Sequence, residues 1–477
     1  MILSKVSKYN LLHQILCKNI FYIVALVIFI ILYHLDFLKL TIPYDKGDAY
    51  GYLNFNFNNL ENIFSNYRSI GFPFLIKIYT FFFKDNFSFL PFIFFFLYIH
   101  SIYFLKNSIN KKNETNLFLE LLFIGLLLNS SFLNGLKFIE TESVSNIIII
   151  YILSFLFRYL EKLKFKHLFL LSLFLLFSVL IRANLIVLYG VVFILFILEI
   201  YRIKIKNKLF LFLKFNTILV FPLVCFLILR YSIIGTVGLA EMNGVVISGH
   251  AIASIQKNYD ISLYNEMENN YIKNALSRIN QLDSPCNDVF KNYENQQNCG
   301  NVLIMTAWLA AINSIDDTKD LDLNPWKSQD ISKLLPQNNL IYNQFLKKVS
   351  SKILFNNFTN YLNRFIHQFS YAIYKTINKI YRNSYIHLFI VLNILAFIYY
   401  YIFNQKVIES FINKIGSKIF ITHLLFYFST IILISLLMHF DYRYINMANI
   451  FLLPAIQIIT VFIIIKFLIF FNFKLKK

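Results

Sequence analysis

Long runs of apolar residues alternate with short polar connections along most of this chain. A stretch of about 20 predominantly apolar residues is long enough to cross a bilayer as an α-helix. The pattern predicts such helices over residues 19–38, 87–105, 116–134, 143–159, 167–181, 183–201, 209–231, 385–404, 419–438 and 450–470. We therefore expect an all-α polytopic membrane protein with about ten transmembrane helices, the first of them too long for a cleaved signal peptide.

The longest polar interruption separates the seventh predicted helix from the eighth. Residues 250–345 are polar and loop-rich, and they predict a small, mostly helical extracytoplasmic lobe. From residue 353 onward apolar residues recur at helical spacing, which indicates an amphipathic helix that lies along the membrane interface or packs inside the lobe. Three parts follow: a transmembrane module at 1–231, the lobe with its amphipathic helix at 232–384, and C-terminal transmembrane helices at 385–477.

Composition agrees with a membrane protein, since 58% of the 477 residues are hydrophobic and only 15% are charged. The net charge of +20 is unevenly distributed, because Lys and Arg gather in alternate connections. These basic connections are residues 5–18, 106–112, 158–166, 202–208, 406–418 and 474–477. Basic residues favour the cytoplasmic side, so we expect both termini in the cytoplasm. We expect the protein to lie in a bacterial inner membrane. The charge then reflects topology, and we expect no nucleic-acid partner.

Two of the four cysteines, Cys286 and Cys299, lie in the predicted external segment. An oxidising compartment would allow them to form a disulfide that closes a small polar loop. Two unpaired thiols remain the alternative.

Charged residues gather at the predicted outer ends of the helices, whereas the sequence contains no Gly-rich phosphate loop, no G-x-S-x-G and no H-E-x-x-H. These residues are Asp45, Asp48, Arg68, Glu140, Glu142, Arg182, Arg230, Asp441 and Arg443. Each one alone is readily explained as a snorkelling or salt-bridged charge. As a set on one side they suit sugar transfer from a lipid-linked phosphate, because a carboxylate can deprotonate an acceptor hydroxyl and arginines can bind the phosphate.

Four segments resemble the external loops of the GT-C membrane glycosyltransferases, which use dolichyl- or undecaprenyl-phosphate sugars and include mannosyl- and aminoarabinose transferases. "GDAYGYL" followed by "YRSIGFPFLIKIY" resembles their first external loop, and "KFIETESVSNIIII" resembles the second. "SVLIRANLIVLYG" and "HFDYRYINMANIFLLP" resemble two later segments that carry an arginine. The matching positions are Asp48, Tyr52, Arg68, Gly71, Pro73, Glu142, Arg182, Arg443 and Tyr444.

The resemblance implies a GT-C fold with interfacial helices. It also implies transfer of a sugar, with inversion, from a polyprenyl-phosphate donor to an extracytoplasmic acceptor, which is a glycan, a lipid or a protein. Asp48 would be the catalytic base, and Glu142 a second acid that orients the acceptor or a metal ion. Donor contacts would come from three arginines and two tyrosines: Arg68, Arg182, Arg443, Tyr52 and Tyr444. The family commonly has Asp-Glu or Glu-x-Asp where this chain has Asp-x-x-Asp, so Asp45 is a candidate auxiliary acid or ligand of a divalent cation such as Mg²⁺ or Mn²⁺.

Two other functions remain open. An O-antigen polymerase or ligase of the Wzy type would also have many spans and a large external loop, but would depend more on loop arginines and a histidine. A flippase for lipid-linked oligosaccharides should lack the long external segment and carry charges midway through its spans.

The uneven distribution of lysines generates a prediction about topology. A reporter that is active only outside the cytoplasm should stay silent when fused after Lys477 and should be active when inserted near residue 290, because the charge bias places these positions on opposite sides. The reverse activities would contradict the orientation.

Overall fold

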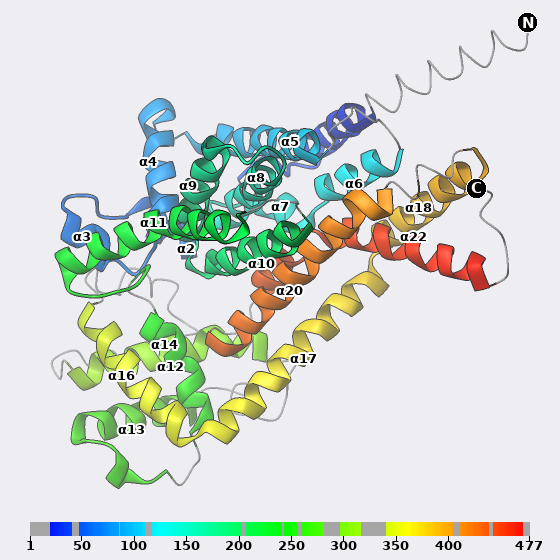
Figure 1. Cartoon of the computed structure of the whole chain (residues 1–477). Helices are drawn as coiled ribbons and strands as arrows, with labels where there is room; N and C mark the ends of the chain where they lie inside the picture. Colours follow the sequence, from blue (N-terminus) through cyan, green and yellow to red (C-terminus); the bar gives the residue numbers. More distant parts are fainter. Residues whose placement is uncertain are drawn as a thin grey trace, which may run out of the picture.

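The computed structural model describes residues 20–40, 47–84, 86–109, 117–202, 207–240, 243–255, 259–280, 296–315, 340–403, 408, 411–437 and 442–470. In these residues the chain forms helices and no strands (Figure 1). Apolar stretches become helices because a helix satisfies its backbone hydrogen bonds internally, which is required wherever water is excluded.

Short connections join the helices in the first half of the chain. After the apolar helix Ile20–His34 come α2 (Gly47–Leu53), α3 (Leu60–Ser65), α4 (Gly71–Phe83), η1 (Phe87–Phe89), α5 (Leu90–Ile109), α6 (Leu117–Leu127), α7 (Ser130–Gly135), α8 (Thr141–Lys162), α9 (Phe165–Ile181), η2 (Ala183–Ile186), α10 (Val187–Arg202) and α11 (Lys208–Ile234).

The second half contains a group of less apolar helices and then the C-terminal helices. They are α12 (Asn243–Ser254), η3 (Ile261–Leu263), α13 (Glu266–Asn280), α14 (Gln296–Ile315), α16 (Leu340–Asn356), α17 (Phe358–Arg382), α18 (Ser384–Phe403), the π-helix η5 (Phe411–Gly416), α20 (Ser417–Leu437), α21 (Tyr442–Ala448) and α22 (Leu452–Phe470).

Seven helical stretches among the described residues are long and apolar enough to cross a membrane. They correspond to seven of the predicted spans: 87–105, 116–134, 143–159, 183–201, 209–231, 385–404 and 419–438. The other three predicted spans, 19–38, 167–181 and 450–470, correspond to apolar helices of 10–17 described residues. The molecule is therefore an all-helical protein whose helices suggest integral membrane insertion.

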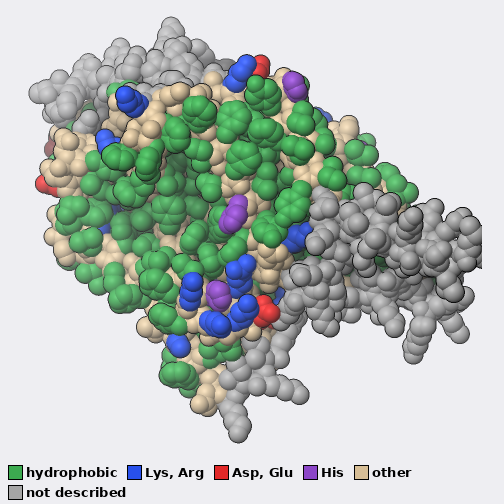
Figure 2. Space-filling view, turned by 90° about the horizontal axis from the view of Figure 1, so that it is seen from above, with side chains coloured by type: hydrophobic (Ala, Val, Ile, Leu, Met, Phe, Trp, Pro, Cys, Tyr) green, Lys and Arg blue, Asp and Glu red, His purple; other side chains and the backbone are tan. Residues whose placement is uncertain are grey.

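Helix α8 forms the centre of the apolar bundle. Its most apolar stretch is 89% buried, whereas that of α11 is only 17% buried and leaves Leu209, Phe221 and Ile228 exposed. A helix that is apolar all round belongs in the middle of a bundle or in lipid. Figure 2 shows a face on which apolar side chains predominate and Lys and Arg gather mainly in one cluster, as expected for a lipid-contacting protein.

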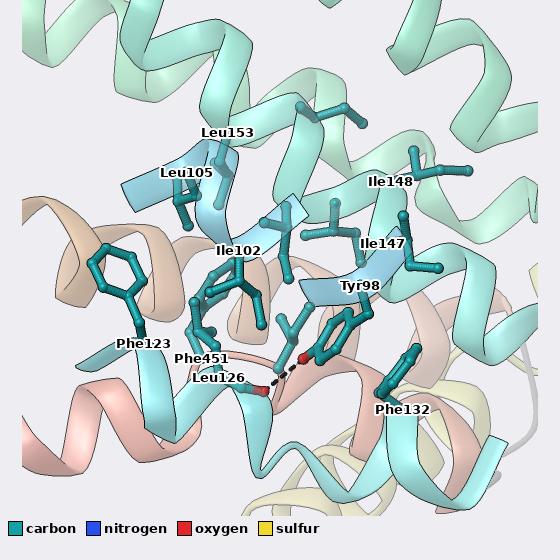
Figure 3. Packing of buried hydrophobic residues seen from close by; sticks show 14 of the residues in the cluster. Tyr98, Ile102, Leu105, Phe123, Leu126, Phe132, Ile147, Ile148, Leu153 and Phe451 are labelled. Carbon is teal, nitrogen blue, oxygen red and sulfur yellow. Dashed lines mark hydrogen bonds between the residues drawn. The ribbon is translucent and has the colours of Figure 1, made fainter. Parts of the chain in front are cut away.

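The predicted span 116–134 is interrupted in the structure at residues 128–129, between α6 and α7. The side chain of Asn129 accepts a hydrogen bond from the backbone N–H of Ser131 at 3.0 Å and so caps α7. Tyr98 of α5 donates its hydroxyl to the carbonyl of Leu126 at 2.6 Å, and its ring stacks on Phe132 (Figure 3). The tyrosine thus satisfies a carbonyl that the end of α6 leaves without a helical partner.

A second hydrophobic core is formed by α12, α13, α14 and α16, with Trp308 and Tyr271 fully buried in it. These helices lie together in the lower left of Figure 1, apart from the apolar bundle. The ring of Tyr67 joins this core and packs edge-on against Trp308 at a centroid distance of 6.1 Å. The segment between α3 and α4 therefore touches both parts of the molecule.

Helix α17 is amphipathic, as its spacing predicts, and extends from the second core to the apolar bundle (Figure 1). One face packs on α12 and α20, where Ala372 meets Tyr427 and Ile431. Apolar side chains stay exposed elsewhere on the helix: Phe358, Leu362, Ile366, Tyr374, Ile377 and Tyr381. The sequence left open whether this helix lies along the membrane interface or packs inside the lobe. Its exposed apolar side chains show that the second core does not enclose it.

Helix α13 begins with a reciprocal capping arrangement. Asn265 accepts a hydrogen bond from the N–H of Glu268 at 2.8 Å, and Glu268 Oε2 accepts one from the N–H of Asn265 at 3.1 Å. Each side chain satisfies a backbone donor that the first helical turn leaves without a partner. Lys352 of α16 also binds Glu268, at 2.6 Å, so the cap connects two helices of the second core.

We predict that Asn265→Ala weakens the second core by about 1 kcal/mol, since it removes a cap. Hydrogen exchange in residues 266–280 should accelerate roughly fivefold, while exchange in α8 stays unchanged. Asn270→Ala, at an exposed position on α13, is the matched control and should have no such effect. Equal acceleration in both variants would contradict a capping role.

Candidate functional site

An ion pair joins the start of α8 to the end of α9. Nη1 of Arg182 lies 2.8 Å from Oε1 of Glu142 and donates a second, longer hydrogen bond to the hydroxyl of Thr141 at 3.3 Å. The ring of Tyr444, from α21, lies against the guanidinium with its centroid 4.5 Å from Cζ. Residues 142, 182 and 444 were predicted separately from sequence, and the structure brings them together.

The local backbone explains how these side chains meet. Glu140 is extended and ends the preceding loop, so α8 begins at Thr141 with Glu142 in its first turn. Arg182 is also extended, between the last turn of α9 and the short helix η2. Both charged residues thus lie at helix junctions, where the chain turns back and presents its polar groups to one another.

The pair is well buried: only 10% of the Arg182 side chain and 6% of the Glu142 side chain are exposed. Removing one partner of such a pair typically costs about 3–5 kcal/mol, because the other charge is left buried without compensation. The arrangement is costly to assemble among apolar helices, and such intramembrane or near-membrane charges are functional-site hypotheses by default. Its chemistry is that of a guanidinium held in a fixed orientation.

A second cluster, from the first predicted external loop, surrounds Arg68. Its Cζ lies 4.9 Å from the ring centroid of Tyr52 and 5.0 Å from that of Tyr67, so both rings are within cation–π range of the guanidinium. Asn66 accepts a hydrogen bond from the backbone N–H of Arg68 at 2.9 Å. A Cβ on Gly51 would collide with the hydroxyl of Tyr67 and lie 3.1 Å from Nε of Arg68, so a larger residue at position 51 would displace these two side chains.

Gly71 connects the two clusters. A Cβ at this position would lie 2.6 Å from the carbonyl carbon of Leu180 and 2.7 Å from the nitrogen of Ile181. The start of α4 therefore packs backbone to backbone against the two residues that precede Arg182. Phe72 then meets the ring of Tyr52 edge-on at 4.9 Å, which places α2 over the same junction.

The structure describes the remaining predicted site residues only in part. Asp48 is the second residue of α2, one helical turn before Tyr52, and its side chain lies outside the described part of the chain. The side chain of Arg443, which precedes Tyr444 in α21, is likewise outside it. Asp45 and Cys286 lie outside the described residues altogether, and Cys299 is described only as a backbone position of α14. Their predicted roles stay predictions.

Sequence reasoning missed Lys379, at the C-terminal end of α17. Its Nζ donates to Oγ of Ser130 at 2.7 Å and to Oδ1 of Asn446 at 2.9 Å. No carboxylate among the side chains that the structure describes forms an ion pair with it. Burial lowers the pKa of Lys379 to about 8, because the charged form loses solvation.

Lys379 belongs to a polar contact between α17 and α21. One turn earlier, the hydroxyl of Thr376 accepts hydrogen bonds from Tyr427 at 2.9 Å and from Asn449 at 3.1 Å. Asn446 of α21 and Asn449, in the turn that follows α21, are three residues apart, the spacing at which side chains share one face of a helical turn. This spacing was the signal in the sequence that could have predicted the polar contact, although it does not say which helix the two asparagines meet.

A divalent cation has little support in the described residues. No three His, Cys, Asp or Glu side chains in this part of the chain gather as a metal site. Glu142 is already bound to Arg182, and Mg²⁺ prefers several oxygen ligands; Asp45 and the side chain of Asp48 lie outside the described part of the chain. We therefore derive no chemical step through a metal ion.

Comparison with known proteins adds no family assignment: no family model, curated protein or solved structure matches the chain.

The close packing at Gly71 generates a stability prediction. Gly71→Ala should lower stability by about 1–3 kcal/mol, since the added methyl group meets backbone atoms of α9 that cannot move independently. The thermal unfolding midpoint of the detergent-solubilised protein measures this. Gly190→Ala in α10 is the control; nothing lies within 4 Å of its Cβ position, so the midpoint should hold or rise. Equal shifts in both variants would contradict the packing argument.

Proposed function

We propose that the protein is a GT-C type glycosyltransferase that transfers a sugar from a polyprenyl-phosphate donor to an extracytoplasmic acceptor. The observation that carries the proposal is the arrangement around Arg182: a buried guanidinium, oriented by Glu142 and Tyr444, next to a packing junction that leads to Arg68. Arginine binds phosphate through planar, charge-assisted hydrogen bonds. Gly71, three residues after Arg68, packs against the two residues that precede Arg182.

The proposed chemistry assigns a role to each group. Asp48 takes the proton from the acceptor hydroxyl, whose oxygen attacks the anomeric carbon of the donor sugar. The bond from that carbon to the phosphate oxygen breaks, and the polyprenyl phosphate leaves with inversion at carbon. Arg68 and Arg182 stabilise the charge on the leaving phosphate, and Arg443 is the third candidate contact. Glu142 fixes the orientation of Arg182, while Tyr52 and Tyr444 hold the two cations from their ring faces.

The proposed topology has about ten spans, adding the three shorter apolar helices to the seven candidates. Both termini are cytoplasmic, the membrane is the bacterial inner membrane, and the second core is the extracytoplasmic lobe. Two ion pairs fit this orientation: Lys106 with Glu120, at 2.6 Å, and Lys418 with Glu199, at 3.2 Å. All four residues lie at helix ends that the lysine distribution assigns to the cytoplasm, opposite the Arg182 site. The exposed apolar side chains of α17 fit a helix at the membrane interface.

The two alternatives find less support. A Wzy-type polymerase or ligase would use an accessible loop histidine, whereas His250 is fully buried within α12 and its ring meets Tyr361 edge-on. A flippase would carry charges midway through its spans. The ion pairs of the described apolar helices lie near helix ends instead.

The decisive experiment measures transfer from the donor that co-purifies with the protein, identified by native mass spectrometry. We predict that Asp48→Asn reduces turnover by about 100- to 10,000-fold while donor binding is nearly unchanged, because the variant keeps the shape but loses the base. Arg68→Ala and Arg182→Met should weaken donor binding as well as turnover, since each removes a phosphate contact.

Asp45→Asn is the matched control for Asp48→Asn and should lose much less activity. Large losses in both variants that also respond to chelators would instead indicate a metal-binding pair. Full transfer by Asp48→Asn with the true donor would refute the catalytic assignment. Absence of any co-purifying polyprenyl phosphate, together with no transfer from polyprenyl-phosphate sugars, would refute the proposed function itself.

A further inference from the structure

A pocket of about 480 Å³ opens between α2, the segment that follows it, and α4. This size falls within the range of about 300–1,000 Å³ that is usual for small-molecule sites. Its lining includes five aromatic residues, among them Tyr52, Phe57 and Phe87, and the polar residues Asn54, Lys77 and Thr80. None of the roles proposed above uses this pocket.

The polar and apolar lining residues differ in depth. Phe87 and Tyr52 are buried, whereas Asn54 and Lys77 are exposed at the rim. A pyranose ring has the matching character, because its C–H groups form apolar faces and its hydroxyl groups project from the edge. A polyprenyl chain is apolar along its whole length and gains nothing from a polar rim. Such a chain has a more suitable surface on α4 itself, where Phe74, Phe81 and Phe82 are exposed.

The positive charge of Lys77 at the rim of the pocket indicates which substituent the bound sugar carries. Among the described side chains, no carboxylate forms an ion pair with Lys77. An ammonium at the edge of an aromatic pocket favours an anionic substituent on the ring, since charge-assisted hydrogen bonds are stronger than neutral ones. A sugar carboxylate, as in a uronic acid, is the simplest such substituent.

Tyr52 links the pocket to the proposed phosphate site. Its ring lines the pocket and also contacts the guanidinium of Arg68, with 4.9 Å between Cζ and the ring centroid. Asp48 stands one helical turn before Tyr52 on α2. A sugar in the pocket would thus be separated from a phosphate at Arg68 by one aromatic ring, with the proposed base on the same helix.

We propose that this pocket binds an acidic pyranose of the acceptor, with the ring against the aromatic lining and the carboxylate at Lys77. The assignment of this sugar to the acceptor rests on the proposed function; binding of an acidic pyranose does not. The pocket accounts for acceptor specificity, whereas the arginines account for donor binding.

The test uses saturation-transfer NMR on the full-length protein in detergent. The probes are a panel of methyl uronides with the matching neutral methyl glycosides, and farnesol represents a prenyl chain. Wild-type protein should bind at least one uronide more tightly than its neutral counterpart. Lys77→Gln should weaken that uronide about tenfold or more and leave the neutral glycoside unchanged, because only the charge-assisted contact is lost.

Two further variants separate occupancy from folding. Thr80→Phe fills the pocket and should abolish binding of both glycosides, with the thermal unfolding midpoint reported alongside. Lys84→Gln, at the exposed lysine that ends α4 outside the pocket, is the matched control and should bind like wild type.

The inference would be overturned if wild-type protein bound no glycoside of the panel. It would also be overturned if wild-type protein bound farnesol but no glycoside, and Thr80→Phe abolished the farnesol binding. Uronide binding that survives both Lys77→Gln and Thr80→Phe would also overturn it. These outcomes are independent of the transfer assay: loss of uronide binding in the pocket variants supports the inference even if no donor is used, and transfer from a polyprenyl-phosphate sugar supports the proposed function even if no glycoside binds here.

Discussion

The ion pair between Arg182 and Glu142 constrains the arrangement of the candidate site more than any other contact. It ties the end of α9 to the start of α8, the most buried helix of the bundle, at 2.8 Å. Two charges withdrawn from water among apolar helices stay there only if each compensates the other. The helix junctions that carry them therefore cannot slide or rotate independently, and Tyr444 of α21 is held against the same guanidinium.

Two glycines, Gly51 and Gly71, help to position the first predicted external loop, because a residue without a side chain allows its neighbours to pack closely. Gly71 lets α4 approach the backbone of Leu180 and Ile181, and Gly51 leaves room for the ring of Tyr67. The consequence is that Arg68, Tyr52 and the pocket beside α4 lie next to the junction that ends in Arg182. The guanidinium of Arg68 lies 4.9 Å from the ring centroid of Tyr52 and 5.0 Å from that of Tyr67, and aromatic ring faces stabilise a cation.

Polar contacts also determine how the C-terminal part joins the bundle. Lys379 and Thr376 of α17 form specific hydrogen bonds with Asn446 of α21 and with Asn449 in the turn that follows it. Contacts between apolar helices alone leave rotation about the helix axis weakly specified in lipid, because every apolar face is equivalent to the acyl chains. Four polar side chains at helical spacing choose one orientation, which brings Tyr444 of α21 to Arg182.

Sequence by itself determined the helical class, seven of the predicted spans and the amphipathic character of α17, since these follow from the periodicity and length of apolar stretches. It also singled out Glu142 and Arg182 as candidates, because charges near predicted helix ends stand out in an apolar chain, whereas Tyr444 was a candidate only through the family resemblance. Only the tertiary structure decided that these three residues meet, that Lys379 lies against Ser130 and Asn446, and that α2 and α4 enclose a pocket. Helical periodicity identifies a face but not the helix on which that face packs, and contacts across 40 to several hundred residues depend on packing that no local pattern encodes.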